Sequence, residues 1–371
     1  MDSSSTVLLK TPLHDMHVAL GARMVEFAGW SMPVMFTSIA DEHVHTRTAC
    51  SVFDVSHMGR LTLTGRDGEA LLNRICTRNL LRAEVGRSYY SHICREDGGI
   101  LDDVIVSRFE DRWGVVCNGS NRAKIVAWIQ KHALGTDVAL EDQTVATTML
   151  AIQGPRTLEL AEDLSGLDFS SLKRYRFREH DYLGSRLIVY RSGYTGEDGL
   201  EIVFPAESTE VLLPMLLGTE RKPHPVIKPA GLGARDTLRI EAAMPLYGHE
   251  LSEEFDSLTA GQAWCVDLNK DFIGAASMRE LQRAGLRRRL VGLAVEGRRI
   301  ARQNQCVSAK GRPVGKITSG TLSPTLGKSI AMGFVEFGLG EPGATLEVAV
   351  GNKPVNTTVV PLPFYKRPAG P

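Results

Sequence analysis

The sequence lacks several features that mark specialised classes of protein. Among its 371 residues, no apolar run approaches the roughly 18 residues of a membrane-spanning helix. Positive and negative side chains balance, with 43 Lys plus Arg against 43 Asp plus Glu, so the chain has no net positive charge for general nucleic-acid binding. The N-terminal residues do not have the charged segment and long apolar core of a signal peptide. We therefore expect neither a membrane nor a nucleic acid as a partner.

Patterns for disulfides and metals are also missing. The cysteines lie far apart and form no C-x-x-C pair, which favours buried, reduced thiols over a disulfide framework or a zinc site. They are Cys50, Cys76, Cys94, Cys117, Cys265 and Cys306. His43 and His45 have H-x-H spacing but fall in a helical pattern, where residues two apart diverge. The motifs G-x-S-x-G, G-x-x-x-x-G-K-[ST] and H-E-x-x-H do not occur. We predict a protein without a metal.

What is present is the composition of an ordinary globular protein, with 43% hydrophobic and 23% charged residues. The chain is too long for one core, which predicts two or three domains. Helical and strand patterns alternate through residue 275, which favours the α+β class, with two interwoven subdomains over residues 1–280. Strands are predicted at 60–64, 88–95, 99–107, 113–118, 145–153, 186–192 and 200–204. Helices are predicted from the cap Ser38 to about Cys50, at 67–76, from Ser120 onward, and at 155–164, 207–217 and 230–243.

The pattern changes near residue 286. Short strands separated by Gly-rich turns, without a comparable helix signal, predict a small antiparallel barrel or sandwich as a domain of residues 286–371. These strands are predicted at 290–295, 313–318, 330–337, 346–350 and 356–362. The link to this domain carries Arg283, Arg287, Arg288, Arg289, Arg298, Arg299 and Arg302. Such a run fits either a solvated face, which we favour, or a docking surface for an acidic partner.

Two adjacent carboxylates mark the most informative segment, residues 98–106, which read Gly-Gly-Ile-Leu-Asp-Asp-Val-Ile-Val. A β-branched apolar run after two glycines predicts a buried strand entered from a tight turn. Because successive strand side chains point to opposite faces, we expect Asp102 and Asp103 to have separate environments. One would cap the turn or meet solvent. The other would point beneath the sheet, where it must be hydrogen-bonded, paired or aimed at a ligand. A turn-capping Asp with a solvated neighbour also fits.

A second candidate site is the loop of residues 193–199 with the strand that follows it. Three glycines in seven residues predict a tight loop between strands. Glu201 then lies inside a strand, where an acidic residue is unfavourable unless it has a partner. Its carboxylate suits a flat heterocycle with two parallel N–H donors, such as the pyrimidine edge of a pterin. An edge-strand Glu that faces water fits equally well.

A third candidate is the segment of residues 230–239. It is not a dinucleotide fingerprint, because Asp236 replaces the last glycine and no strand clearly precedes it. Arg235 and Arg239 share a helix face, with Asp236 three residues before Arg239. These residues fit either a surface ion-pair set or an arginine that holds a carboxylate of the protein or of a ligand. His57, near a predicted loop-to-strand junction, fits an acid/base role less well than a hydrogen-bonded structural role.

With these segments, the sequence resembles the glycine cleavage T-protein family of aminomethyltransferases over nearly its whole length. The resemblance begins at residues 11–14, Thr-Pro-Leu-His, and 28–33, Ala-Gly-Trp-Ser-Met-Pro. Its core comprises residues 53–59, 98–103, 193–201 and 234–239. In the C-terminal domain it comprises Thr-Ser-Gly at 318–320 and Ser-Pro-Thr-Leu-Gly-Lys at 323–328.

The resemblance implies a three-domain cloverleaf with tetrahydrofolate in a central channel, and no metal. An aminomethyl group would arrive on the lipoyl arm of a carrier, the H-protein. Folate N5 would take the methylene, giving 5,10-methylenetetrahydrofolate, ammonia and the reduced lipoyl carrier. The implied location is the cytoplasm of a bacterium, or the mitochondrial matrix for a processed organellar form.

The resemblance also assigns site residues. The family's catalytic aspartate falls on Asp103, its pterin-binding glutamate on Glu201 and its site arginine on Arg235. Positions that line the folate pocket fall on Met58, Tyr90, Asn118, Tyr194 and Trp264. These roles fit the chemistry, because one placed carboxylate can handle the proton of an amine that leaves as ammonia. Holding N5 against the methylene carbon would contribute much of the remaining rate.

Two functions other than aminomethyl transfer stay open for a chain of this kind. Related enzymes of this fold demethylate sulfonium or amine donors with the same folate, and an assay of lipoylated carrier against small methyl donors separates them. A non-catalytic folate-binding relative of iron–sulfur cluster assembly carries a K-G-C-Y-x-G-Q-E motif. The present chain has Gly-Tyr-Thr-Gly-Glu-Asp-Gly at residues 193–199, without the cysteine, which disfavours that function.

Overall fold

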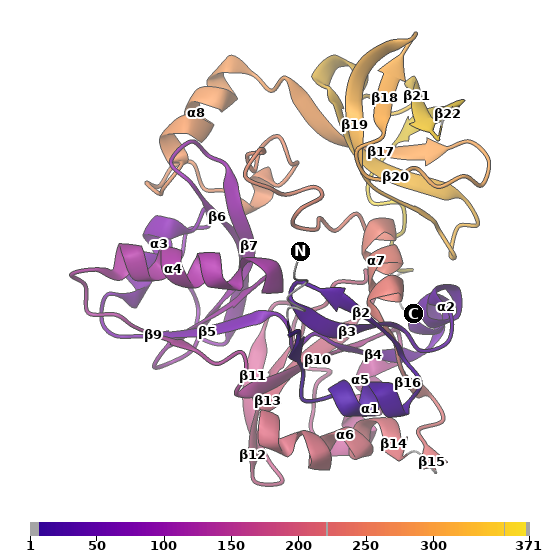
Figure 1. The fold of residues 1–371 in the computed structure, drawn as a ribbon. Helices are drawn as coiled ribbons and strands as arrows, with labels where there is room; N and C mark the ends of the chain where they lie inside the picture. Colours follow the sequence, from indigo (N-terminus) through magenta and orange to yellow (C-terminus); the bar gives the residue numbers. More distant parts are fainter. Residues whose placement is uncertain (1–6, 220–221, 352, 369–371) are drawn as a thin grey trace, which may run out of the picture. The chain divides into compact units, whose positions relative to one another are not determined.

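A computed structural model describes residues 7–219, 222–351 and 353–368, and Figure 1 shows the chain as a ribbon. The described residues form two compact units, each assembled from separate stretches of the chain. The first unit comprises the chain up to Arg60, Asp142–Gly193 and Glu197–Arg235. The second comprises Leu61–Glu141, Tyr194–Gly196 and the chain from Asp236 onward. Sequence neighbours such as Gly193 and Tyr194 therefore belong to different units.

A six-stranded sheet forms the centre of the first unit. From edge to edge, its strands are β11 (Phe177–Tyr182), β12 (Ser185–Tyr190), β13 (Gly199–Pro205), β10 (Thr147–Gln153), β4 (Cys50–Asp54) and β16 (Ile227–Pro229). Neighbours are antiparallel except β16, which runs parallel to β4. Smaller sheets are formed by β1 (Leu9–Lys10), β3 (Trp30–Met35) and β2 (Arg23–Phe27), and by β14 (Gly218–Thr219) and β15 (Lys222–Pro223).

Short helices accompany these sheets. They are α1 (His14–Ala19), α2 (Ile39–Thr48), α5 (Thr157–Ser165), the 3-10 turn η2 (Ala206–Ser208), α6 (Thr209–Leu217) and α7 (Leu232–Glu241), which runs into the second unit. The predicted cap Ser38 begins α2, where its Oγ accepts a hydrogen bond of 3.1 Å from the Asp41 N–H. Leu160 of α5 and Leu213 of α6 belong to one buried cluster with Leu150 of β10. Alternate strand residues therefore face the helices.

The second unit contains a five-stranded sheet. In spatial order, its strands are β6 (Arg87–Cys94), β7 (Ile100–Arg108), β8 (Trp113–Cys117), β5 (Gly59–Thr64) and β9 (Ala139–Asp142). Its helices are α3 (Gly68–Ile75) and α4 (Arg122–Ala133), the latter preceded by the 3-10 turn η1 (Gly119–Asn121). The turn into β7 is tight, as predicted, because Gly98 adopts a φ of 89° that favours glycine.

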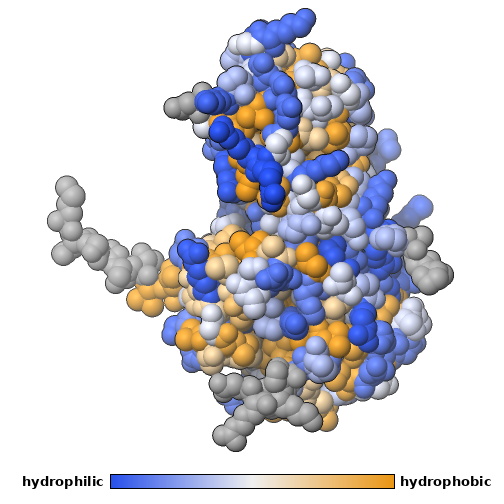
Figure 2. Space-filling view, turned by 90° about the vertical axis from the view of Figure 1, so that its right-hand side faces the viewer, coloured by the Kyte–Doolittle hydropathy of each residue, from blue (hydrophilic) through white to orange (hydrophobic). Residues whose placement is uncertain are grey.

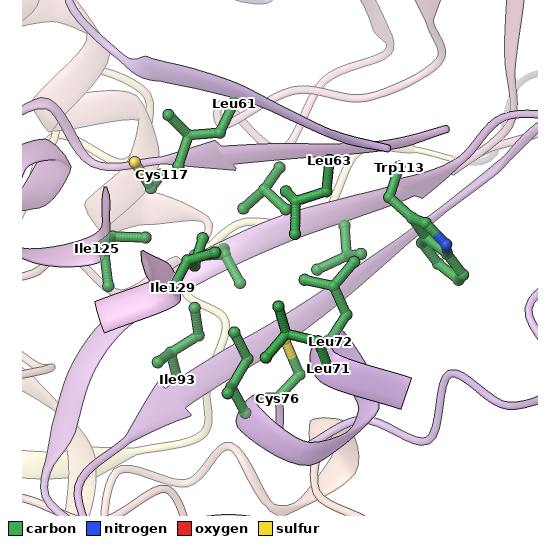
Figure 3. Close-up of a cluster of buried hydrophobic side chains, with 14 of the residues drawn as sticks. Leu61, Leu63, Leu71, Leu72, Cys76, Ile93, Trp113, Cys117, Ile125 and Ile129 are labelled. Atoms are coloured by element: carbon green, nitrogen blue, oxygen red, sulfur yellow. The ribbon is translucent and has the colours of Figure 1, made fainter. Parts of the chain in front are cut away.

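Leucine and isoleucine side chains fill the space between this sheet and its helices, as Figure 3 shows. Leu61 and Leu63 of β5 cluster with Leu72 of α3 and with Ile125 and Ile129 of α4. Each of these side chains is at most 2% exposed. Burial contributes roughly 1.5–3 kcal/mol for each such side chain, so this packing fixes which face of the sheet meets the helices.

A closed antiparallel barrel forms the C-terminal part of the second unit, coloured orange to yellow in Figure 1. Around the barrel, its strands are β17 (Arg288–Val295), β20 (Ser329–Glu336), β19 (Arg312–Leu322), β18 (Cys306–Ala309), β21 (Thr345–Val350) and β22 (Lys353–Val360). Buried aliphatic residues such as Leu293, Ile317 and Val348 form its core. The other elements of this unit are the 3-10 turns η3 (Ala263–Cys265) and η4 (Phe337–Leu339) and the helix α8 (Ala275–Ala284).

The predicted fold class is confirmed: strands and helices are mixed, and an antiparallel barrel closes the C-terminal part. Some local predictions were wrong. Ser120 does not begin α4; it lies in η1, and the helix starts at Arg122. The short strand β16 precedes Ala230, where no strand was expected, because three residues add to the edge of β4. The strand β18 and the helix α8 were not predicted. The domain boundary between residues 280 and 286 stays a prediction.

Candidate functional site

Asp102 and Asp103 lie on β7, whose two faces differ. Val104 and Val106 belong to the apolar core with α3 and α4, and alternation places Asp102 on their face. Asp103 projects from the other face, directly opposite His92 of β6 in the strand register. The two carboxylates therefore leave the strand on opposite sides, as expected.

Asp102 is completely buried, so it is not the solvated turn residue that the sequence also allowed. It accepts three hydrogen bonds from the segment after β8. The Asn118 backbone N–H lies 2.9 Å from Oδ2, while the side-chain Nδ2 atoms of Asn118 and Asn121 lie 2.8 Å and 2.6 Å from Oδ1. These bonds satisfy a buried carboxylate and hold the chain that leads into α4. Asp102 thus serves the fold.

Asp103 is half-buried, and two side chains of the described residues donate hydrogen bonds to it. The Tyr90 hydroxyl donates to Oδ2 at 3.0 Å, and Asn118 Nδ2 donates to Oδ1 at 2.7 Å. Burial, with the Asp103 charge as a further cause, raises the pKa of Tyr90 well above its ordinary value, so the phenol stays neutral. Asp103 is therefore positioned by groups that do not themselves carry charge.

One amide joins the two carboxyls, because Asn118 Nδ2 donates to both. This corrects the expectation of separate environments. Burial raises the pKa of Asp102 and of Asp103, and the charge on Asp103 raises that of Asp102 further. The pair therefore retains a proton more readily than two isolated aspartates. All the partners of Asp102 are donors, whereas the Tyr90 oxygen can also accept, so the proton is best placed on Asp103.

His92 was not identified from the sequence, yet it completes this cluster. It shares a face of β6 with Tyr90 and is completely buried. Its Nε2 lies 3.3 Å from the Tyr90 hydroxyl and its Nδ1 lies 2.7 Å from the Ser257 hydroxyl. Burial lowers the pKa of His92 to about 3, so the imidazole is neutral. The available signal was the Tyr-x-His spacing, which puts both side chains on one strand face.

Two aromatic residues of the predicted pocket also belong to the second unit. Trp264, in η3, stacks on Tyr90 with a ring-centroid distance of 5.2 Å and an interplanar angle of 19°. It remains 56% exposed, so one side of the indole can receive a flat ligand. Tyr194 donates its hydroxyl to the Pro245 carbonyl. The structure thus brings together four of the predicted residues, namely Tyr90, Asp103, Asn118 and Trp264.

Glu201 lies in the first unit, in the interior strand β13. It pairs in register with Ala151 of β10 on one side and Tyr190 of β12 on the other. The alternative of a water-facing edge strand is therefore wrong. Ser192 Oγ donates to its Oε2, and within the described part of the chain this is the one side chain hydrogen-bonded to Glu201. The second carboxylate oxygen, Oε1, has no such side-chain partner there.

The glycines before Glu201 have a packing reason. A Cβ atom on Gly193 would lie 1.9 Å from Oε1 of Gln153, and one on Gly199 would lie 2.2 Å from Nε2 of the same side chain. Gln153 is fully buried on β10. The loop can therefore pass close over this amide only with glycine at both positions.

His57 is a buried neutral residue of the first unit. Burial lowers the pKa of its imidazole to about 4, opposed by the Asp54 carboxylate and assisted by the charges of Arg235 and Arg60. Phe27 packs edge-on against the ring at 5.4 Å between centroids. Among the described residues, no hydrogen-bond partner is present for Nδ1, so the expected structural hydrogen bond is not seen at this atom.

Arg235 and Met58 also lie in the first unit. Arg235 is half-buried at the start of α7 and within electrostatic range of His57. Met58 follows His57 in the turn between β4 and β5, where its N–H donates to the Val55 carbonyl at 3.1 Å. Both residues are partly exposed and lie near the buried His57.

Arg239 pairs with Asp236, as its spacing permits, but it does not lie at the surface. It is only 1% exposed. Its Nη1 donates to Glu250 and its Nη2 to Ser319 of β19, each at 2.8 Å, and Nε donates to Asp236 at the same distance. Glu250 is itself fully buried. Arg239 therefore ties α7 to a barrel strand, and loss of one partner of such a pair typically costs about 3–5 kcal/mol.

The arginines of the link are mostly exposed. Arg289 is half-buried, pairs with Glu341 at 2.7 Å and lies over the Phe337 ring. The exposed ones are Arg283, Arg287, Arg288, Arg298, Arg299 and Arg302. Figure 2 shows strongly hydrophilic side chains over the barrel surface in the upper part of the view. The favoured solvated face is consistent with this exposure.

The described residues contain no group of three or more His, Cys, Asp or Glu side chains arranged to hold a metal ion. All six cysteines are free thiols, five of them buried. No helix in the described ranges has the length and hydropathy needed to cross a membrane.

Comparison with known proteins gives two family matches. Residues 13–270 match the family model described as the GCVT N-terminal domain. Residues 288–366 match the model described as the glycine cleavage T-protein C-terminal barrel domain. Together the two matches cover both the candidate site residues and the barrel.

Individual relatives cover nearly the whole chain. A protein of Moorella thermoacetica named aminomethyltransferase is 45% identical over 97% of this chain and 99% of its own length. One of the same name from Rubrobacter xylanophilus is 44% identical over 97% of this chain and 95% of its own. A crystal structure of glycine cleavage system aminomethyltransferase T from Bartonella henselae has a TM-score of 0.90 and 31% identity, and covers 97% of this chain and 99% of that one.

Proposed function

Because the chain belongs to the glycine cleavage T-protein family, it is an aminomethyltransferase, and we propose that its one-carbon acceptor is tetrahydrofolate. The donor would be an aminomethyl group on the lipoyl arm of the H-protein. The products would be 5,10-methylenetetrahydrofolate, ammonia and the dihydrolipoyl carrier. The observation that carries this proposal is Asp103, a half-buried carboxyl with a raised pKa, held by Tyr90 and Asn118.

The reaction requires proton handling. Two C–N bonds form to folate N5 and N10, while the C–S bond to the lipoyl arm and the C–N bond to the amine break. The two hydrogens that leave the folate nitrogens end on ammonia and on the lipoyl thiol. A carboxyl such as Asp103, whose pKa is raised by burial above its ordinary value, suits this exchange. Asp103 would orient the folate nitrogens and manage the proton of the departing amine.

Other residues would bind the folate without taking part in proton transfer. Glu201 would accept hydrogen bonds from the parallel N–H groups of the pterin pyrimidine edge. Its Oε1 is suited to this, because it has no side-chain partner among the described residues. The exposed face of Trp264 would pack against a ring of the ligand. Further residues proposed to contact the folate are Tyr90, Asn118 and Tyr194 of the second unit, and Met58 and Arg235 of the first. Binding in this way would hold N5 close to the methylene carbon.

The function is tested by ammonia release from aminomethylated H-protein with and without tetrahydrofolate. We expect release to depend on tetrahydrofolate, and 5,10-methylenetetrahydrofolate to form in equal amount. Small sulfonium or methylamine donors should give no product. Turnover of such a donor, with none from the carrier, would replace the proposal with a folate-dependent demethylase. The names of the relatives favour the aminomethyl donor.

The exposed arginines between residues 283 and 302 offer a docking surface for the carrier, if the carrier is acidic. Charge reversal at Arg288 and Arg299 should then lower the association rate, and added salt should have the same effect. A free aminomethyl-dihydrolipoamide donor should react at the wild-type rate. Equal losses with carrier and free donor would mean that these arginines only stabilise the fold.

A further inference from the structure

A chain of hydrogen bonds runs behind the candidate catalytic carboxyl. Asp103 Oδ2 receives the Tyr90 hydroxyl at 3.0 Å, the same hydroxyl lies 3.3 Å from His92 Nε2, and His92 Nδ1 lies 2.7 Å from Ser257 Oγ. His92 and Ser257 are each completely buried. All four residues belong to the second unit. This series of hydrogen bonds therefore connects the half-buried carboxyl of Asp103 to the imidazole of His92, which solvent does not reach.

When Asp103 is ionised, the direction of every hydrogen bond in this series is fixed. A carboxylate only accepts, so Tyr90 must donate to it, and the Tyr90 oxygen is then free to accept from His92 Nε2–H. His92 Nδ1 consequently carries no hydrogen and accepts from the Ser257 hydroxyl. Every polar atom in the chain has a partner in this state.

A second complete order exists when Asp103 is protonated. Asp103 then donates to the Tyr90 oxygen, Tyr90 turns its hydrogen toward His92 Nε2, and His92 Nδ1–H donates to Ser257 Oγ. The two states differ by one proton, which comes from water, and by the tautomer of a neutral imidazole. A side chain with only one arrangement of donor and acceptor would leave a buried group unsatisfied in one state, which is unfavourable.

We propose that His92 is a positioning residue that holds the Tyr90 hydroxyl on Asp103 in both protonation states of that carboxyl by changing its tautomer. The inference rests on the proposed function of Asp103 and adds a residue that acts through Tyr90. Burial lowers the pKa of His92 to about 3, which keeps the ring neutral while the tautomer changes.

Among the titratable groups around this hydrogen-bond chain, the aspartates are the ones that change charge. Cys265 and Tyr194 lie within electrostatic range of Tyr90, and Cys94 interacts with Ser257. Burial raises the pKa of Cys265 to about 12 and raises that of Cys94 strongly, so both thiols stay neutral. Asp102 is linked through Asn118 and is held by donors alone. Asp103 is therefore the group whose titration His92 accompanies.

A direct test is the ¹⁵N spectrum of histidine-labelled protein over pH 5–9, using the full chain. We expect His92 to stay neutral and to shift from the Nδ1–H tautomer toward the Nε2–H tautomer as pH rises. In Asp103→Asn this shift should disappear, because the titrating carboxyl is gone. A protonated His92 at pH 6, or one tautomer throughout in the wild type, would overturn the proposal.

The kinetic test uses His92→Phe, which fills the space but makes no hydrogen bond. We expect kcat to fall about 10–100-fold, a part of the usual worth of an acid/base group, while the Kd of tetrahydrofolate stays within about threefold. The pH limb that Asp103→Asn removes should move upward by about one unit, since the carboxylate loses support. His92→Gln, which can donate and accept, should recover much of kcat. His132→Gln, on α4 beside Trp128, is the matched control and should behave as wild type.

The outcomes separate the two proposals. If Asp103→Asn turns over like the wild type, the proposed role of Asp103 is wrong. If Asp103→Asn is inactive but folded His92→Phe keeps wild-type kcat and pH limb, only the inference about His92 is wrong. Should His92→Phe not fold, Ser257→Ala tests the same chain from its far end. A Ser257→Ala protein with an unmoved limb and an unchanged His92 spectrum would also overturn it.

Discussion

Two strands of this molecule each present an acidic side chain from the interior of a sheet, with very different surroundings. On β7, Asp103 is held by Tyr90 and Asn118, and buried polar groups extend the network behind it. On β13, Glu201 has Ser192 as its one side-chain partner among the described residues. A networked carboxyl can hold or release a proton with little rearrangement, whereas a carboxylate with a spare oxygen is suited to bind N–H donors of a ligand. Under the proposed function, this difference corresponds to Asp103 handling a proton and Glu201 binding the pterin.

The sharpest way to break this comparison is Asp103→Asn, which keeps the shape of the side chain and removes its proton chemistry. Turnover should fall about 10²–10⁴-fold, the usual worth of a positioned acid or base. Folate affinity and melting temperature should change little by comparison, because Asn can still accept from Tyr90 or Asn118. Steady-state rates of ammonia release, measured beside thermal melts, check this. A folded variant with more than a tenth of the wild-type rate would remove Asp103 from the chemistry.

The stability of the protein at acid pH tests the buried histidine of the first unit, His57. Burial lowers the pKa of His57 to about 4 from an ordinary value of 6.5. Below pH 6.5 the unfolded chain therefore binds a proton that the folded state refuses until about pH 4, and this proton lowers the free energy of unfolding by about 3 kcal/mol across that window. His57→Gln should flatten that part of the stability curve. Chemical unfolding of the variant and of the unchanged protein at pH 4.5, 5.5, 6.5 and 8 measures it. An unchanged slope would mean that His57 is protonated in the folded protein.

Glu201→Gln tests the other side of the comparison. Losing the charge should weaken tetrahydrofolate binding by about 1.5–3 kcal/mol, the range for hydrogen bonds to a charged group. Ser192→Ala removes only the hydroxyl that donates to Oε2 and should weaken binding less, by about 0.5–1.5 kcal/mol. Titration calorimetry with tetrahydrofolate measures both variants. An unchanged dissociation constant for Glu201→Gln would place the pterin elsewhere.

Several parts of this site follow from local sequence. The two glycines and the β-branched run predict β7, and strand alternation predicts that Asp102 and Asp103 diverge. The shared amide of Asn118 could not be predicted, because it depends on where β8 ends relative to β7. The pairing of His92 opposite Asp103 depends on a register shift after Ile93, which leaves an extra residue on β7.

Burial of charged residues was the other feature that sequence spacing could not predict. Arg239 and Asp236 have the spacing of a surface pair, and only the fold brings Glu250 and Ser319 to the same guanidinium. Similarly, whether Glu201 lies on an edge or an interior strand depends on β10, about fifty residues earlier in the chain. Local patterns determine elements and faces, but long-range pairing decides which polar side chains meet.

Asp102→Asn gives the finest distinction, because it separates the two adjacent carboxyls of β7. The three groups bonded to Asp102 are all N–H donors, so an Asn side chain would turn its own NH₂ toward at least one of them. Leaving that buried contact unsatisfied should lower the free energy of unfolding by about 1–3 kcal/mol. This loss of stability arises in the segment that leads into α4, which Asp102 holds. At a temperature where the variant is folded, turnover should therefore drop less than about tenfold, in contrast to Asp103→Asn.

Thermal melts and rates on the same samples separate these effects, with Asp111→Asn as a matched control. Asp111 is an exposed aspartate of the loop before β8, and among the described residues its salt bridge is with Arg112, so its substitution should change neither quantity. If Asp102→Asn kept the wild-type melting temperature but lost as much rate as Asp103→Asn, the two carboxyls would act as one catalytic unit through Asn118. The distinction between a structural and a catalytic aspartate would then be wrong, and the shared amide would be part of the chemistry.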